Sequence, residues 1–227
     1  MKKFFAGLLY RPVFWLAGEV LDEFPEARKP FINSLVPVAE RVYPDDVNLR
    51  PQTIVHHLKR YWFASQFIKK GQRVLDYACG SGYGTQILQE KSNVVAMGYD
   101  INQEALDYAT NHFHRPMFFY KMEWLPYNFG LITFFEAIEH MTKEEGKETL
   151  EKLKGLLAEN GTLVISIPCK LDTQRNGFHK SHWDRFVLAS YLGRLFKTVG
   201  VTYQDWDTGE IGNKGIGPDF YIFVCKK

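Results

Sequence analysis

The stretch 74–85, VLDYACGSGYGT, predicts a buried strand that ends at Asp76, a tight loop, and a helix from about Tyr83. Three glycines at every second position follow the carboxylate: Gly80, Gly82 and Gly84. They lack side chains, so the backbone can turn sharply and lie close to a ligand, toward which the next helix directs its positive end. The order differs from the G-x-G-x-x-G of dinucleotide binders. A carboxylate ahead of the glycines favours a ligand with a cationic end.

Beyond this stretch, apolar strands alternate with amphipathic helices. The helices include 52–69 and 142–158, the second of which begins with the capping-box pair Thr142 and Glu145. Strands are expected at 73–77, 93–100, 117–120, from Leu131, and at 161–168, 201–207 and 219–227. Such alternation indicates a parallel sheet, whereas the last two runs have no helix between them and predict a hairpin. The expected fold is α/β: a doubly wound, seven-stranded, mostly parallel sheet with an antiparallel last strand.

The composition excludes several classes of protein. Basic and acidic residues nearly balance at 28 and 26, with a net charge of +2. This balance gives no support to an electrostatic nucleic-acid binder, and no nucleic-acid partner is expected. Three dispersed cysteines form neither a disulfide framework nor a zinc motif. A reducing compartment, and therefore the cytoplasm, is expected.

Residues 1–51 form a proline-interrupted extension that is expected to be helical. Its apolar run 4–21 contains Arg11, Pro12 and Glu19, which argue against a signal peptide and a membrane span. Two interpretations remain open for this extension. It either packs on the domain as a cover over a cleft, or it lies in a membrane surface as a peripheral anchor.

These motifs resemble those of class I S-adenosylmethionine-dependent methyltransferases of types 11 and 23. The stretch 74–85 is similar to motif I, and FGLITFFEAIEHM at 129–141 resembles the strand-four motif F-D-x-V-x-x-x-E-V-x-E-H-x. Gly130 replaces the usual aspartate. The segment GFHKSHWDRFVLASYL resembles F-H-x-x-x-F-x-x-x-x-L, and HHLKRYWFASQF resembles sugar O-methyltransferases of glycan biosynthesis. The resemblance implies a lid over 1–51 and a cofactor-binding domain over 52–227.

The family pattern implies a role for each cofactor contact. Asp100 would accept both ribose hydroxyls, although it could also cap the next helix, and Ile101 would pack on the adenine. In YKMEWLPY, Lys121 occupies the usual acid's position, so Met122 and Glu123 are the implied adenine contacts. Arg60 would lie near the methionine end. The implied cofactor-binding residues are Tyr61, Asp76, Ala78, Gly80, Gly82, Asp100, Ile101, Met122, Glu123, Phe135 and Glu136.

The implied reaction is transfer of the methyl group of S-adenosylmethionine to a hydroxyl of a sugar or glycan intermediate. The hydroxyl proton needs a base, and His140 and His179 are the candidates. Each also has a structural interpretation, as a helix-start hydrogen bond and as a packed loop histidine. Other small molecules, such as a quinone or lipid precursor, remain open as acceptors, and so does a cofactor-binding regulator without catalysis.

A second chemistry uses a metal ion. The small-RNA 3′-end 2′-O-methyltransferases use a similar E-x-x-E-H pattern with a further histidine, which implies an RNA 2′-hydroxyl as an alternative acceptor. Glu136, Glu139, His140 and His179 would then hold Mg²⁺ or Mn²⁺. Many metal-free relatives carry the same pattern, so no metal is the leading expectation.

Overall fold

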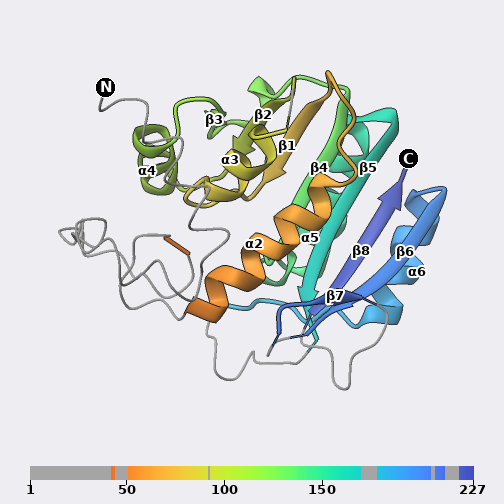
Figure 1. The fold of residues 1–227 in the computed structure, drawn as a ribbon. Coiled ribbons are helices and arrows are strands. Elements are labelled where there is room, and N and C mark those ends of the chain that lie inside the picture. The colour runs from red at the N-terminus through yellow and green to blue at the C-terminus, as the bar shows by residue number, and fades with distance from the viewer. Residues whose placement is uncertain (1–41, 44–50, 92, 170–177, 206–207, 213–219) are drawn as a thin grey trace, which may run out of the picture.

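One mixed sheet organises the protein, whose computed structural model describes residues 42–43, 51–91, 93–169, 178–205, 208–212 and 220–227. The extension predicted over 1–51 therefore lies almost wholly outside the described residues. The strands are β1 (Arg73–Tyr77), β2 (Val95–Tyr99), β3 (Met117–Phe119), β4 (Phe129–Phe135), β5 (Leu157–Pro168), β6 (Thr198–Gln204), β7 (Ile211–Gly212) and β8 (Phe220–Lys226). They form one sheet in the order β3-β2-β1-β4-β5-β8-β6-β7 (Figure 1).

The predicted strand directions are confirmed, and the strand number needs a correction. The first five strands pair in parallel, while β8 is antiparallel to both β5 and β6. The sheet has eight strands rather than seven, because the two-residue strand β7 adds to the edge at β6. Two residues are too short to give a hydrophobic alternation. Strand β5 also begins four residues early, at Leu157, with a register shift against β4.

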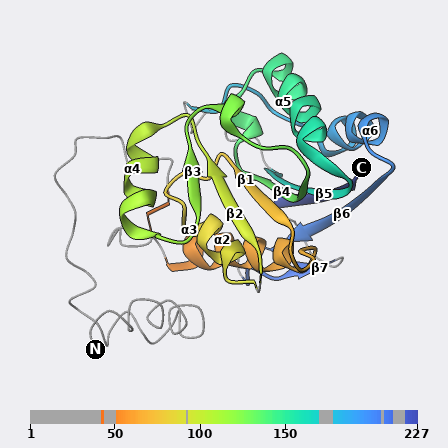
Figure 2. The same ribbon diagram turned by 90° about the horizontal axis from the view of Figure 1, so that it is seen from above.

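Helices cover both faces of the sheet (Figure 2). They are α2 (Pro51–Ser65), α3 (Tyr83–Gln89), α4 (Gln103–His112), α5 (Lys143–Leu156) and α6 (Arg185–Leu195), with two short 3₁₀ helices, η4 (Met122–Trp124) and η5 (Ile138–His140). Successive strand residues face opposite sides. Leu75 and Ile132 belong to the core beneath α5 and α6, whereas Val74 and Leu131 belong to the core beneath α2 and α3.

Local sequence signals predicted where the helices start better than where they end. The capping box of α5 is present, with Glu145 N–H donating to Thr142 Oγ1 and Thr142 N–H donating to the Glu145 carboxylate. Helix α2 ends at Ser65, earlier than the expected Lys69, and α5 ends at Leu156. Asn102, rather than Asp100, caps α4 by accepting from Ala105 N–H.

The glycine that replaces an aspartate of the family pattern has a packing reason. A Cβ on Gly130 would overlap the side-chain amide of Gln72. The Gln72 amide oxygen accepts a hydrogen bond from Lys69 N–H and closes the turn before β1. A side chain at position 130 would therefore displace that turn.

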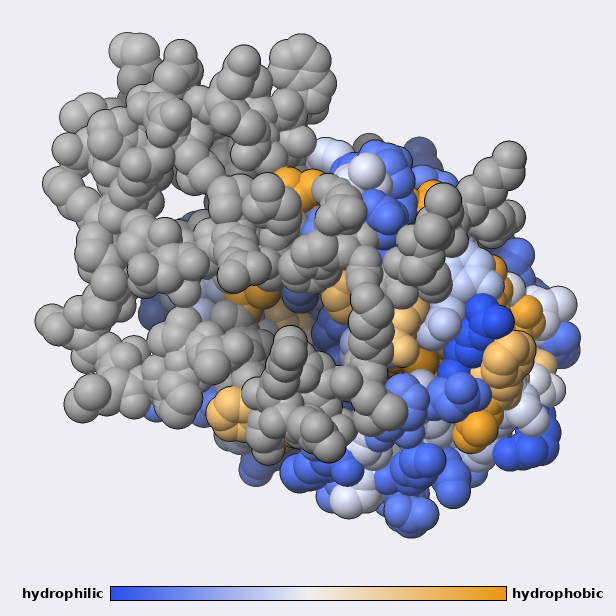
Figure 3. All heavy atoms as spheres, turned by 90° about the horizontal axis from the view of Figure 1, so that it is seen from below, coloured by the Kyte–Doolittle hydropathy of each residue, from blue (hydrophilic) through white to orange (hydrophobic). Residues whose placement is uncertain are grey.

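The parallel strands end along one edge, where ligands of open α/β sheets bind. Figure 3 looks onto this edge, and its described surface places hydrophobic side chains among hydrophilic ones. Among the described helices, none has the length and apolar character needed to cross a membrane.

Candidate active site

The loop after β1 turns through three residues with left-handed backbones. Ala78, Gly80 and Gly82 have φ values of 61°, 53° and 80°. A Cβ on Gly80 would meet nothing within 4 Å, whereas one on Gly82 would lie 2.6 Å from Ala109 Cβ. The loop is therefore open to a ligand at Gly80. Helix α3 has only seven residues, so the glycine backbone contributes more to this site than a helix dipole does.

The third glycine serves packing rather than ligand approach, which corrects the expectation for the motif. A Cβ on Gly84 would overlap the ring of Tyr61 on α2. The absence of a side chain at Gly84 lets α2 lie directly on α3. Tyr61 then reaches the sheet, where its hydroxyl donates to Asp76 Oδ1 at 3.2 Å and its ring meets Phe135 edge-on at 5.1 Å.

Asp76 is buried among hydroxyl groups. Besides Tyr61, Thr85 Oγ1 donates to Asp76 Oδ2 at 2.9 Å, and Thr133 Oγ1 donates to Asp76 Oδ1 at 2.8 Å. Burial raises the pKa of Asp76 to about 6, against the opposing effect of these three hydrogen bonds. The carboxylate thus joins α2, α3 and β4 at the base of the loop. Its predicted contact with the cofactor stays a prediction.

Asp100 ties the second strand to the glycine loop. Gly80 N–H donates to Asp100 Oδ2 at 2.9 Å, and Asn102 N–H donates to Asp100 Oδ1 at 2.8 Å. A carboxylate oxygen can accept more than one hydrogen bond. Ile101, the predicted adenine contact, is 82% exposed next to this carboxylate.

The loop after β3 forms the one-turn helix η4. Met122 packs on the core, while Glu123 is exposed. The Lys121 ammonium lies over the Trp124 ring at 5.0 Å, and Trp124 is 51% exposed. Contacts of Met122 and Glu123 with a cofactor stay predictions.

Glu136 follows β4 in a constrained conformation. Its φ of 46° is left-handed, which is costly for a residue with a side chain and is typical of functional sites. Ser166 Oγ donates to Glu136 Oε1 at 2.6 Å and accepts from Glu136 N–H at 3.2 Å. Arg60 Nη1 lies 3.2 Å from the same Oε1. The Glu136 side chain keeps 19% of its surface exposed.

His140 and His179 are brought together. Their ring centroids lie 4.9 Å apart, and ligand atoms of Glu139, His140 and His179 all lie within 4.8 Å of one another. The backbone of 178–181 fastens this group, because Lys180 and Ser181 donate to Glu139 O and Phe178 O lies 3.3 Å from His140 Nδ1. Glu136, expected as the fourth ligand, is not in this group and instead contacts Arg60 and Ser166.

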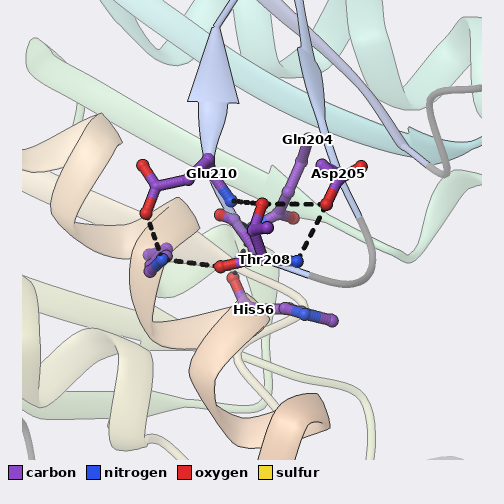
Figure 4. Close-up of polar contacts among 7 residues, drawn as sticks. His56, Gln204, Asp205, Thr208 and Glu210 are labelled. Carbon is purple, nitrogen blue, oxygen red and sulfur yellow. Dashed lines mark hydrogen bonds and ion pairs between the residues drawn. The ribbon is translucent and has the colours of Figure 1, made fainter. Parts of the chain in front are cut away.

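Gln204 was missed as a site residue, and Arg60, which the family resemblance placed near the methionine end, is its partner. Arg60 is 1% exposed. Its Nε donates at 2.6 Å to Oε1 of Gln204, which lies 144 positions later in the chain. Figure 4 shows Gln204 beside α2, together with the turn after β6. The signal in the sequence was a polar residue among apolar ones. Arg60 lies on the buried face of α2, and Gln204 interrupts a strand-like run.

Comparison with known proteins agrees with the fold. Residues 49–203 match the family model described as "Methyltransferase domain". A SAM-dependent methyltransferase from Archaeoglobus fulgidus is 19% identical, with a TM-score of 0.62, covering 78% of this chain and 94% of that one. Magnesium protoporphyrin IX methyltransferase from Synechocystis PCC 6803, solved with SAM, is 15% identical, with a TM-score of 0.59, covering 94% and 93%.

A third solved structure has the same architecture. The TehB-like SAM-dependent methyltransferase from Corynebacterium glutamicum is 19% identical, with a TM-score of 0.57, and the match covers 76% of this chain and 88% of that one. No curated protein matches the sequence. Because the family model spans well over half of the 227 residues, the chain belongs to the methyltransferase-domain family and has the fold of the class I S-adenosylmethionine-dependent methyltransferases.

Proposed function

We propose that the protein is an S-adenosylmethionine-dependent O-methyltransferase that methylates a hydroxyl of a sugar or glycan intermediate. The observation that carries the proposal is the Asp100 carboxylate bound to Gly80 N–H beside the open side of that glycine. A carboxylate at the end of β2 suits the two vicinal hydroxyls of a ribose. The adenine would then extend toward Ile101 and the η4 loop with Met122 and Glu123.

The methionine end would lie on the opposite side of the loop, toward α2 and the end of β4. An amino-acid end carries an ammonium and a carboxylate. Glu136 offers an acceptor for the first, since its Oε1 is used by Ser166 and Arg60 while Oε2 has no hydrogen bond in the described part of the chain. Arg60 offers a donor for the second, because within the described residues its Nη2 lacks a hydrogen-bond partner, while its Nη1 lies 3.2 Å from Glu136 Oε1. Tyr61, whose hydroxyl donates to Asp76 Oδ1, would lie at this end of the site.

The chemistry needs a base near the reacting hydroxyl. The methyl–sulfur bond breaks with its electron pair staying on sulfur, the oxygen–methyl bond forms, and the hydroxyl proton moves to the base. A backbone carbonyl only accepts, so the contact with Phe178 O assigns the proton of neutral His140 to Nδ1 and leaves Nε2 as an acceptor. His179 lies beside it and is the second candidate.

The same catalytic side chains would serve hydroxyl groups of other molecules. The experiment therefore compares several classes of acceptor. The purified protein is incubated with methyl-labelled cofactor and, separately, with nucleotide sugars, polyprenyl phenols, and an RNA oligonucleotide with a free 3′-terminal 2′-hydroxyl. We expect label in the sugars. Label only in the phenols would favour a quinone or lipid precursor, and label only in RNA would favour the 2′-hydroxyl reaction. Binding of cofactor with no label in any acceptor would favour a regulator without catalysis.

The histidine assignment has its own test. His140→Gln and His179→Gln are compared with His114→Gln, whose imidazole is exposed at the surface. Loss of the base should lower kcat by about 10²- to 10⁴-fold, with cofactor affinity nearly unchanged. Equal rates in all three variants would remove both histidines from the mechanism.

A divalent metal is a second candidate, favoured by the grouping of Glu139, His140 and His179. Two imidazoles and one carboxylate suit a first-row transition ion such as Mn²⁺ better than Mg²⁺, which prefers oxygen ligands. A bound ion would lower the pKa of an acceptor hydroxyl. The hydrogen bond of His140 Nδ1 would orient its Nε2 as a ligand, as second partners do in metal sites.

Metal binding is testable without an acceptor. Titration with Co²⁺ should give a visible absorption band that is lost in Glu139→Gln and kept in His114→Gln. Full methyl transfer in the presence of a strong chelator, together with no band, would reject this candidate.

We also propose that the reaction takes place in the cytoplasm, a reducing compartment. The proposal is supported by the sequence, whose three cysteines are dispersed and odd in number.

A further inference from the structure

Gln204, at the end of β6, sits entirely inside the molecule and uses its whole side-chain amide. It is 0% exposed. Its Oε1 accepts from Arg60 Nε at 2.6 Å, and its Nε2 donates to His56 O at 2.9 Å and to Gly209 O at 3.1 Å. The opposite amide orientation would set a donor against a donor and an oxygen against two carbonyls, so chemistry fixes the assignment.

These bonds join α2 to the turn after β6 (Figure 4). The turn lies close to the helix, since a Cβ on Gly209 would come within 2.7 Å of His56 Cδ2. A second, more exposed contact adds to the attachment: Lys59 Nζ lies 2.6 Å from Glu210 Oε1 and donates to Thr208 O at 2.7 Å. An exposed ion pair of this kind contributes little to stability. The buried Gln204 contact is therefore the one that fixes the helix.

From Gln204 the polar contacts continue to the end of β4. The guanidinium of Arg60 lies over the Phe220 ring at 4.1 Å and reaches Glu136, which Ser166 holds from β5. The side-chain amide of Gln204 is neutral, so it orients Arg60 without competing with Glu136 for the positive charge of the guanidinium. Glu136 is then the sole carboxylate paired with Arg60 within the described chain.

We propose that Gln204 is a positioning residue for methyl transfer. It fixes Arg60 in the orientation in which Arg60 holds the Glu136 carboxylate against the ammonium of the cofactor. Gln204 itself touches no reacting group in this arrangement. This inference rests on the proposed function, because it takes Glu136 to be a cofactor contact. It adds a positioning residue on β6, the strand next to the edge strand β7.

A double-mutant cycle tests whether Gln204 acts through Glu136. The affinity for S-adenosylhomocysteine is measured by calorimetry for the unmodified protein, Gln204→Leu, Glu136→Gln and the double variant. We expect Gln204→Leu to weaken binding about tenfold alone and less than twofold when Glu136→Gln is already present, since contacting groups are non-additive. A residue that only maintains the fold would weaken binding equally in both backgrounds.

Two further variants keep the test decisive. Arg60→Lys retains the charge but loses Nε, the atom that donates to Gln204. It should weaken binding about as much as Gln204→Leu, and it replaces that variant in the test if Gln204→Leu folds poorly. Glu210→Gln changes the same turn at its exposed contact and should leave affinity within twofold. An equal effect of Gln204→Leu in both backgrounds, or an unchanged affinity in Glu136→Gln, overturns the inference. Absence of binding by the unmodified protein would instead overturn the proposed function beneath it.

Discussion

Replacement of Gly84 by alanine should loosen α2 from the site. The new Cβ would overlap three carbons of the Tyr61 ring, each inside 3.0 Å, so the ring must move. Overpacking costs about 1–3 kcal/mol, and loss of the Tyr61–Asp76 hydrogen bond adds about 1.5 kcal/mol. Alanine returns at most about 1 kcal/mol of helix propensity. The free energy of unfolding should therefore fall by about 1.5–3.5 kcal/mol.

Urea unfolding followed by calorimetry with S-adenosylhomocysteine measures both consequences. Gly155→Ala is the matched control, because Gly155 lies in α5 and an added Cβ there would meet nothing within 4 Å, so this change should be neutral or stabilising. Adding Tyr61→Ala to Gly84→Ala should recover part of the overpacking cost but not the cofactor affinity. Unchanged stability and affinity in Gly84→Ala would refute the claim that this glycine exists to admit Tyr61.

Three other substitutions separate binding from stability. Asp100→Ala should weaken S-adenosylhomocysteine binding by about 1–3 kcal/mol through the unpaired ribose hydroxyls, and unchanged calorimetric affinity would refute the ribose assignment. Burial raises the pKa of Asp76 from 3.8 to about 6, so the native state binds the proton more tightly and the unfolding free energy should fall as pH rises from about 4 to 6. Asp76→Asn should remove that part of the slope in urea titrations, and the same slope in both proteins would assign it to other groups. Thr142→Ala should lower stability by about 1 kcal/mol through the lost cap, with cofactor affinity as the unaffected control measurement.

The features that sequence predicted well are local in the chain. The run from β1 through the glycine loop to α3 carries its own strand, turn and helix signals, and each falls where expected. The directions of β5, β6 and β8 also followed from the presence or absence of an intervening helix.

The remaining features depend on contacts between distant segments. Gly84 has the same spacing in the sequence as Gly80 and Gly82. Its role in packing is evident only from the structure, where the Tyr61 ring of α2 lies against it. Gln204 and Arg60 are 144 residues apart, so no local pattern connects them. The proximity of His140 to His179 likewise depends on backbone bonds from 178–181 to η5.

The position of β8 bears on the order in which the molecule can form. This strand comes after all the others in the sequence, yet it lies between β5 and β6 and hydrogen-bonds to both. During synthesis, β6 and β7 must wait for Phe220–Lys226 before they can join the earlier strands, and such long-range pairing forms slowly. Gln204 is carried on β6, so Arg60, made much earlier, obtains its partner only then. A nascent chain should consequently complete its proposed cofactor site late, after its first strands and helices have already assembled.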